Sequence, residues 1–188
     1  MRIEEMHFTL KDGRAAALRS PSEEDAERML DYVVNASGET PFLLRYPEEW
    51  ADYTIEREKS ILKSALEADD RAMLTCFVGE RVAGSCSIAL NGDMKTRHRA
   101  SVAIAIRREY WGNGIGTRML VELERVAVTR GVTQLELDFI EGNTRAQRLY
   151  EKAGYHITGV RPDAIRFRDG SMANEIMMVK RIEEMRER

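Results

Sequence analysis

The sequence predicts an α/β fold of the α+β kind: a mixed, mostly antiparallel sheet with one parallel strand-helix-strand crossover and helices on both faces. Three observations lead to this prediction. Alternating or apolar runs typical of strands lie on both sides of two helical patterns in the first half of the chain. A strand-helix-strand unit spans 98–140. No repeat, low-complexity stretch or linker interrupts the 188 residues, so a single domain over 1–188 is expected.

The first elements are two short strands and a helix. The strands are expected within 7–20, around the hairpin turn Asp12-Gly13. An apolar stripe then predicts a helix over 20–38. We expect Ser20 to be its N-cap, with Pro21 in the first helical position and Glu23 completing a capping box.

The remaining elements follow the same hydrophobic periodicities. An irregular loop is expected over 39–53 and a helix over 54–68. An antiparallel strand pair follows at 73–78 and 81–90, then a third strand at 98–108 and a longer helix at 115–130. The last elements are a strand at 132–140, a short helix at 144–153 and two strands at 155–160 and 174–180.

Composition argues against several classes of function. The net charge is −3, the pI is about 5.8 and no long Lys/Arg run occurs, so nucleic-acid binding is not indicated. No apolar stretch reaches membrane-spanning length and no signal-peptide core is present, so we expect a cytoplasmic protein with no membrane partner. A turn at Gly79-Glu80 would place Cys76 and Cys86 on opposite faces of a hairpin, which argues against a disulfide. No Cys/His cluster has zinc-ligand spacing, so no metal is expected.

Three glycines at alternate positions, Gly112, Gly114 and Gly116, come directly before the longer helix. The first N–H groups of a helix have no intrahelical partner and carry partial positive charge, so a loop without side chains lets a phosphate bind there. A glycine-rich turn that only allows close strand-to-helix packing fits the loop equally well. Gly116 is followed by Thr117-Arg118, which excludes a Walker-type loop, and the G-x-G-x-G spacing does not fit the dinucleotide fingerprint.

A second motif, "LELDFIEGNTRAQRLYEKAGY", carries polar groups at the end of a strand and along a short helix. Together with the glycine loop it resembles the GCN5-related N-acetyltransferase (GNAT) superfamily. "AIRREYWGNGIG" is similar to that family's strand and pyrophosphate loop, and the pattern N-x-x-A-x-x-L-Y-E-K-x-G-Y over 143–155 is similar to its second motif. The resemblance is specific over about 98–160 and only architectural before Ala72.

The resemblance implies an N-acetyltransferase that moves an acetyl group from acetyl-CoA to a primary amine by direct attack on the thioester. It also implies that the pantetheine arm of coenzyme A pairs with the backbone at the end of the 98–106 strand, which splays from 132–140. Trp111 stands where the family has Arg or Gln, which leaves phosphate binding mainly to backbone N–H groups. The implied cofactor-binding residues are Ile104, Ile106, Trp111, Gly112, Asn113, Gly114, Ile115, Gly116, Thr117 and Asn143.

Two residues are candidates for the proton transfers. The family pattern places its thiol-facing tyrosine at Tyr150, although its position on an apolar helix stripe also fits a core tyrosine. Asp138, at the strand end, is the candidate base and would act through water, or it is a plain exposed strand residue. His98 and Glu39 are further candidates for the base, with a strand-edge histidine and a solvated loop charge as the alternatives. Asn143 fits a helix cap as well as a cofactor contact.

The acceptor is not defined by the sequence. Segments 39–50 and 160–172 are expected to select it, because loops on a rigid scaffold commonly carry specificity. The aromatic residues of these segments also fit a lid that packs on itself. The family resemblance makes a homodimer an expectation as well. The alternatives to an N-acetyltransferase are a non-catalytic acyl-CoA-binding regulatory or sensor domain and a nucleotide-phosphate enzyme.

Overall fold

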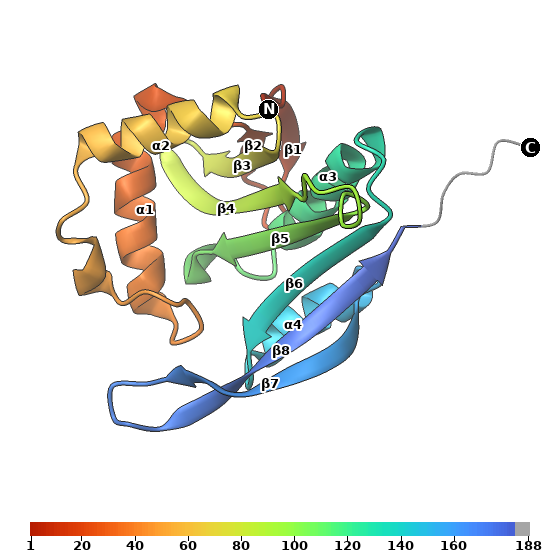
Figure 1. Ribbon diagram of the computed structural model, residues 1–188. Helices are drawn as coiled ribbons and strands as arrows, with labels where there is room; N and C mark the ends of the chain where they lie inside the picture. Colours follow the sequence, from red (N-terminus) through yellow and green to blue (C-terminus); the bar gives the residue numbers. More distant parts are fainter. Residues whose placement is uncertain (183–188) are drawn as a thin grey trace, which may run out of the picture. The chain divides into compact units, whose positions relative to one another are not determined.

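The computed structural model describes residues 1–182 and confirms the predicted order of strands and helices. The strands are β1 Met6–Thr9, β2 Ala15–Arg19, β3 Arg71–Val78, β4 Arg81–Leu90, β5 Arg99–Ile106, β6 Gln134–Ile140, β7 His156–Arg166 and β8 Met172–Arg181 (Figure 1). The α-helices are α1 Ala26–Glu39, α2 Ile55–Glu67, α3 Ile115–Thr129 and α4 Thr144–Lys152. Short 3₁₀ turns lie at Glu23–Asp25, Pro47–Trp50 and Arg108–Tyr110.

The strands form a mixed sheet in the order β1-β2-β3-β4-β5-β6-β8-β7. It is mostly antiparallel, and β5 with β6 is the parallel pair, as predicted. The chain divides into two compact units, one of Met1–Ala89 with Ile104–Met119 and the other of Leu90–Ala103 with Leu120–Arg188. Both β5 and α3 run through the boundary, and the single domain over 1–188 stays a prediction.

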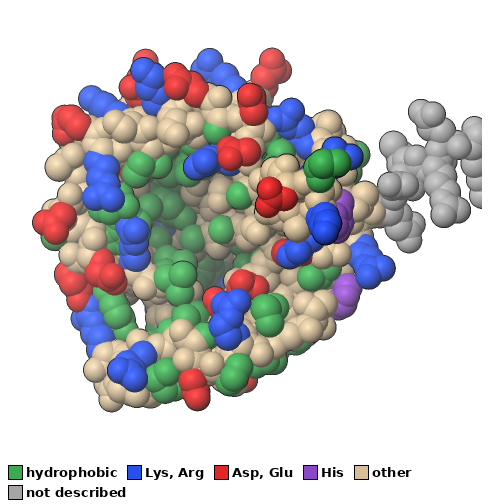
Figure 2. Space-filling model, in the orientation of Figure 1, with side chains coloured by type: hydrophobic (Ala, Val, Ile, Leu, Met, Phe, Trp, Pro, Cys, Tyr) green, Lys and Arg blue, Asp and Glu red, His purple; other side chains and the backbone are tan. Residues whose placement is uncertain are grey.

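Figure 2 shows basic and acidic groups interspersed on the face that it presents, in keeping with the net charge of −3. Within residues 1–182, no helix combines the length and the apolar composition needed to cross a membrane.

In the first unit, α1 and α2 pack together and against the strands. The core they share consists of Ala26, Met29, Tyr32, Ala36, Leu62, Phe77 and Val82. The first four of these residues lie on one face of α1, and they pack with Leu62 of α2 and with the two strand residues, so their burial holds α1 in place.

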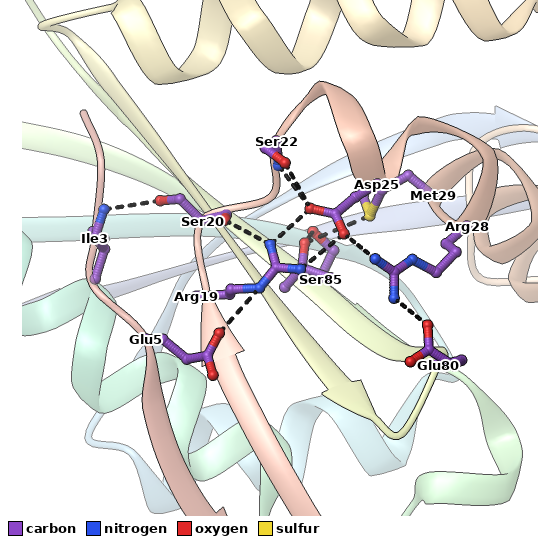
Figure 3. A network of polar contacts seen from close by, with 11 residues as sticks. Ile3, Glu5, Arg19, Ser20, Ser22, Asp25, Arg28, Met29, Glu80 and Ser85 are labelled. Carbon is purple, nitrogen blue, oxygen red and sulfur yellow. Dashed lines mark hydrogen bonds and ion pairs between the residues drawn. The ribbon is translucent and has the colours of Figure 1, made fainter.

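The start of the first helix differs from the prediction. Ser22, not Ser20, precedes the first turn, and the Asp25 carboxylate accepts a hydrogen bond from the Ser22 backbone N–H at 2.8 Å (Figure 3). The Ser20 hydroxyl instead accepts from the Ile3 N–H at 2.9 Å. Asp25 takes the capping role, and Arg19 and Arg28 donate to the same buried carboxylate, whose lowered pKa keeps it ionised.

The pairing of β3 with β4 differs from the prediction for Cys76 and Cys86. A register shift between Cys76 and Phe77 moves the pairing by one residue, so Leu74 lies opposite Cys86. Residues directly opposite each other share a face, and so do residues two apart on a strand. Cys76 and Cys86 therefore lie on the same face, not on opposite faces. Both are buried free thiols, as expected.

In the second unit, the last hairpin is longer than predicted. The strand pairing of β7 with β8 continues to Arg166 and Met172, so most of 160–172 is strand. A register shift between Arg161 and Ile165 accommodates the intervening residues, which include Pro162. The prediction of a loop over 160–172 is therefore wrong, and only residues 167–171 form the turn.

Candidate active site

The glycine loop opens onto free space directly before α3. Gly112 and Gly114 have φ values of 80° and 88°, a backbone conformation that favours glycine. A Cβ at Gly112 would meet nothing within 4 Å, and one at Gly114 would meet only the Lys11 Cε, at 4.0 Å. The helix begins at Ile115, so its unpaired N–H groups follow the open loop at once. This cradle fits a diphosphate.

Side chains on both sides of the glycines fix the shape of the loop. The Trp111 indole Nε1 donates to the Ile106 carbonyl at 2.7 Å. The Asn113 side-chain oxygen accepts from the Asp12 N–H at 3.2 Å. The side chains of Trp111 and Asn113 thus bind the protein's own backbone and hold the loop in shape.

The turn between β1 and β2 adds a positive charge beside this loop. Lys11 is exposed, and its Cε is the atom nearest to the open side of Gly114. Arg14, from the same turn, places its guanidinium carbon 4.7 Å from the ring centroid of the buried Tyr110. The sequence of this segment indicates only a hairpin turn. Nothing in it signals that the turn meets the glycine loop 101 residues later, a contact that the Asp12–Asn113 bond shows directly.

The parallel ladder is short. β5 and β6 pair over Arg99–Ser101 and Gln134–Glu136, and the ladder ends there although both strands continue. Ile104 and Ile106 are half-buried residues beyond the ladder's end. Backbone groups beyond the end of a ladder are free to pair with an added strand, which is the role expected for this segment.

In the second unit, the ring of Tyr150 is buried. The side chain is 6% exposed and packs between Phe139 and Tyr155, with ring centroids 5.9 and 6.1 Å away. Burial raises the pKa of Tyr150 to about 12, so its phenol keeps its proton at neutral pH. Within residues 1–182, the hydroxyl has no hydrogen-bond partner in the protein, which leaves its proton available to a ligand.

Asp138 lies on the face of β6 opposite to Phe139, the residue that packs against Tyr150. Along this strand Leu135, Leu137 and Phe139 are buried, while Asp138 is exposed and lies opposite Met177 of β8. Since neighbouring residues of a strand point to opposite faces, Asp138 points away from the Phe139 face that holds Tyr150. The two candidate catalytic residues therefore have no direct contact.

The other candidates have defined places. The Asn143 side-chain oxygen accepts from the Ala146 N–H at 3.2 Å, which confirms its role as the cap of α4. Glu39 is not a solvated loop charge, because it ends α1 and its carboxylate binds Arg107 and the Arg108 N–H at 3.1 and 2.6 Å. His98 is exposed just before β5, and its carbonyl accepts from the Thr133 N–H at 2.9 Å.

Comparison with known proteins decides between the classes of function that the loop allows. Residues 36–155 match the model of the acetyltransferase (GNAT) family. The chain belongs to this family. The acetyltransferase is 28% identical over 133 residues to a thialysine N-epsilon-acetyltransferase of Bos taurus, which covers 62% of this chain and 78% of the relative.

Two solved structures with the same fold support the family assignment. The acetyltransferase matches the crystal structure of a GNAT-family acetyltransferase from Streptococcus pneumoniae with a TM-score of 0.82 and 26% identity, over 89% of this chain and 99% of the other. A Salmonella typhimurium structure, described as a putative acetyltransferase with its cofactor acetyl-CoA, shares the fold with a TM-score of 0.75 and 15% identity, over 92% and 96% of the two chains. Acetyl-CoA is the acyl donor of this enzyme, an N-acetyltransferase, as the sequence predicted.

Proposed function

We propose that this acetyltransferase acetylates a primary amine, on a small molecule or at a peptide N-terminus, by direct attack on the thioester of acetyl-CoA. The observation that carries the proposal is the buried phenol of Tyr150, whose hydroxyl has no hydrogen-bond partner within residues 1–182 and whose pKa is raised by burial, because a thiolate leaving group needs a proton donor that is still protonated at neutral pH. Acetyl-CoA supplies the activated acetyl group, and the chain supplies binding and proton transfer.

The reaction balances with two proton movements. An N–C bond forms and the C–S bond of the thioester breaks; the amine loses a proton and the leaving sulfur gains one. A lysine-like amine has a pKa of roughly 10.4 and is mostly protonated at pH 7, so it needs a base. Asp138 is proposed to accept its proton through water, and Tyr150 to donate to the sulfur.

The acidity of Tyr150 suits a sulfur that is itself buried. A thiol in water has a pKa of roughly 8.5, well below that of the buried phenol. Burial raises thiol pKa values as well: in this same chain it raises the pKa of Cys76 to about 12. A thiolate that leaves into a buried site is therefore expected to take up a proton more readily than one in water.

The phosphates are proposed to bind the backbone of the loop from Gly112 to Thr117, with Trp111, Asn113 and Ile115 shaping it. The open side of Gly114 supports this role, because it leaves the loop's amides unshielded. Lys11 adds a positive charge there. The pantetheine arm is proposed to pair with the backbone at Ile104 and Ile106, and Asn143 to contact it in addition to capping α4.

The segment 39–50 of the first unit and the segment 160–172 of the second are each proposed to take part in selecting the acceptor. Part of the first segment packs on itself, because the Arg45 guanidinium carbon lies 4.7 Å from the centroid of Trp50, whose ring makes an edge contact with Tyr53 at 4.9 Å. Leu44, in contrast, is 72% exposed and free to meet a ligand. The thialysine ε-amine named for the bovine relative makes a free side-chain amine the first acceptor class to test.

The deciding experiment is the release of free thiol from acetyl-CoA over a panel of amines that includes thialysine, lysine, polyamines and peptides with free N-termini. We expect release that depends on the acceptor. Tight coenzyme A binding with no acceptor-dependent release would contradict the proposal and indicate a non-catalytic sensor.

A homodimer is proposed as well, through β7. This strand ends the sheet order, and Ile157 and Val160 are 47% and 50% exposed along it. Exposed apolar residues on an edge strand are typical of surfaces that pair with another chain. Light scattering should give twice the mass of one chain; a mass of one chain would contradict the dimer. The cytoplasmic location and the absence of nucleic-acid partners stay predictions.

A further inference from the structure

Helix α1 holds the end of β5 at two points within the first unit. The Tyr32 hydroxyl donates to the Ala105 carbonyl at 2.8 Å. Two helical turns later, the Glu39 carboxylate accepts from Arg107 Nε and from the Arg108 N–H. Seven residues of helix span about 10.5 Å, and the three steps from 105 to 108 span about 10 Å of extended chain. The two spacings match, so one helix face can hold both points.

The Tyr32 hydroxyl replaces a hydrogen bond between strands. The Arg107 N–H donates to the Ala83 carbonyl at 2.9 Å, and continuing that antiparallel pairing places Ala105 opposite Ser85. The Ser85 N–H donates to the Tyr32 hydroxyl oxygen at 3.2 Å, and the hydroxyl in turn donates to Ala105. A buried side chain, 3% exposed, thus bridges two strands that would otherwise bond directly.

The bridge turns the Ala105 carbonyl out of the ladder. A Cβ on Gly84 would lie 2.8 Å from the Ala105 oxygen, so that oxygen lies over the face of Gly84 toward α1. In a trans peptide the C=O and the next N–H point in opposite directions. The Ile106 N–H therefore points away from Tyr32, while the Ile106 carbonyl is held by Trp111.

We propose that Tyr32 is a positioning residue: by holding the Ala105 carbonyl, it aims the Ile106 N–H at a carbonyl oxygen of the acyl-CoA arm. The inference rests on the proposed function, because it assumes that the arm pairs with this strand. It adds a residue from α1 to the donor site, and it explains why a buried tyrosine hydroxyl is inserted between β4 and β5. Without the hydroxyl, Ser85 and Ala105 can close the ladder directly and rotate the Ile106 N–H.

The test compares two ligands by calorimetry. Coenzyme A carries the pantetheine arm, and adenosine 3′,5′-bisphosphate carries phosphates without it. For Tyr32→Phe we expect the Kd of coenzyme A to rise about tenfold, the size of one lost hydrogen bond, and the Kd of the bisphosphate to stay within about twofold. The matched control is Tyr53→Phe, which removes a hydroxyl bonded to Arg45 at 2.8 Å and should change neither Kd.

The outcomes separate the two proposals. Unchanged coenzyme A affinity in Tyr32→Phe, or equal weakening for both ligands, would overturn the positioning role and leave the proposed function intact. A wild-type protein that does not bind coenzyme A would overturn the proposed function and this inference with it. If Tyr32→Phe does not fold, amide NMR of the wild type decides: the Ile106 N–H should shift strongly with coenzyme A and little with the bisphosphate, and equal shifts would contradict the proposal.

Discussion

The ring of Tyr150 packs against the ring of Phe139 at 5.9 Å, while the neighbouring Asp138 points to the opposite face of β6. The two polar groups proposed for the proton transfers, the Tyr150 hydroxyl and the Asp138 carboxylate, therefore lie on opposite faces of this strand. A direct acid–base pair is excluded by this geometry. Separate roles, one at the leaving sulfur and one at the amine through water, are compatible with it.

Removing the phenol should slow the reaction without weakening donor binding. Tyr150→Phe keeps the buried ring and its packing, and deletes only the hydroxyl, so the fold should be retained. Turnover is expected to fall about 100-fold, the lower range for loss of a general acid. Steady-state kinetics with acetyl-CoA titrations measure both quantities. An unchanged rate would make Tyr150 a core residue only.

Adding a side chain to the glycine loop should weaken the binding of coenzyme A. In Gly114→Val a branched side chain fills the space before α3, and the Kd of coenzyme A should rise at least about tenfold by loss of amide contacts. Gly79→Val is the matched control, because Gly79 also has a positive φ and open space at its Cβ but lies in the β3–β4 turn. If both variants fold and bind coenzyme A equally well, the loop is not the phosphate site.

Lys11 should contribute a smaller, salt-dependent part of the affinity. Lys11→Met removes an exposed charge beside Gly114 and is expected to raise the Kd of coenzyme A about three- to fivefold at low salt. The difference should shrink as salt is added, since exposed charges are screened. Lys59→Met, on the exposed side of α2, provides the comparison. Identical salt curves for the two variants would remove Lys11 from the phosphate site.

The acid sensitivity of the fold should depend on Asp25. Burial by itself disfavours the charged carboxylate, but the hydrogen bonds from Arg19 and from the Ser22 N–H outweigh it and hold the pKa of Asp25 below its ordinary value (Figure 3). A lowered folded pKa stabilises the protein above the unfolded pKa of about 3.9, and this stability is lost as the pH falls through the folded value.

Asp25→Asn should therefore destabilise the protein at pH 7 by about 2–3 kcal/mol, because two arginines lose their buried partner, and should flatten the acid limb of the stability curve. Urea unfolding at several pH values measures this. Asp70→Asn, which removes an exposed pair with Arg71, should leave the curve unchanged. A steep acid limb that survives in Asp25→Asn would assign the acid sensitivity to another group.

The sequence predicts features that depend on neighbours along the chain. Hydrophobic periodicity determines the order of elements, and the alternate glycines indicate an open loop because Gly112 and Gly114 need positive φ. The features that the sequence could not predict depend on contacts between segments far apart in the chain. Tyr32 and Ala105 are separated by 73 positions, and nothing in the helical pattern around Tyr32 distinguishes a bridging hydroxyl from a core ring. The register shift at Cys76 is missed for a similar reason, since a turn sequence alone does not reveal an extra residue in the ladder.

The most direct test is a crystal structure of the protein with coenzyme A. We expect the diphosphate oxygens to lie within hydrogen-bond distance of the backbone N–H groups between Gly112 and Thr117. A complex in which the diphosphate binds elsewhere, with this loop closed by the protein's own side chains, would contradict the account.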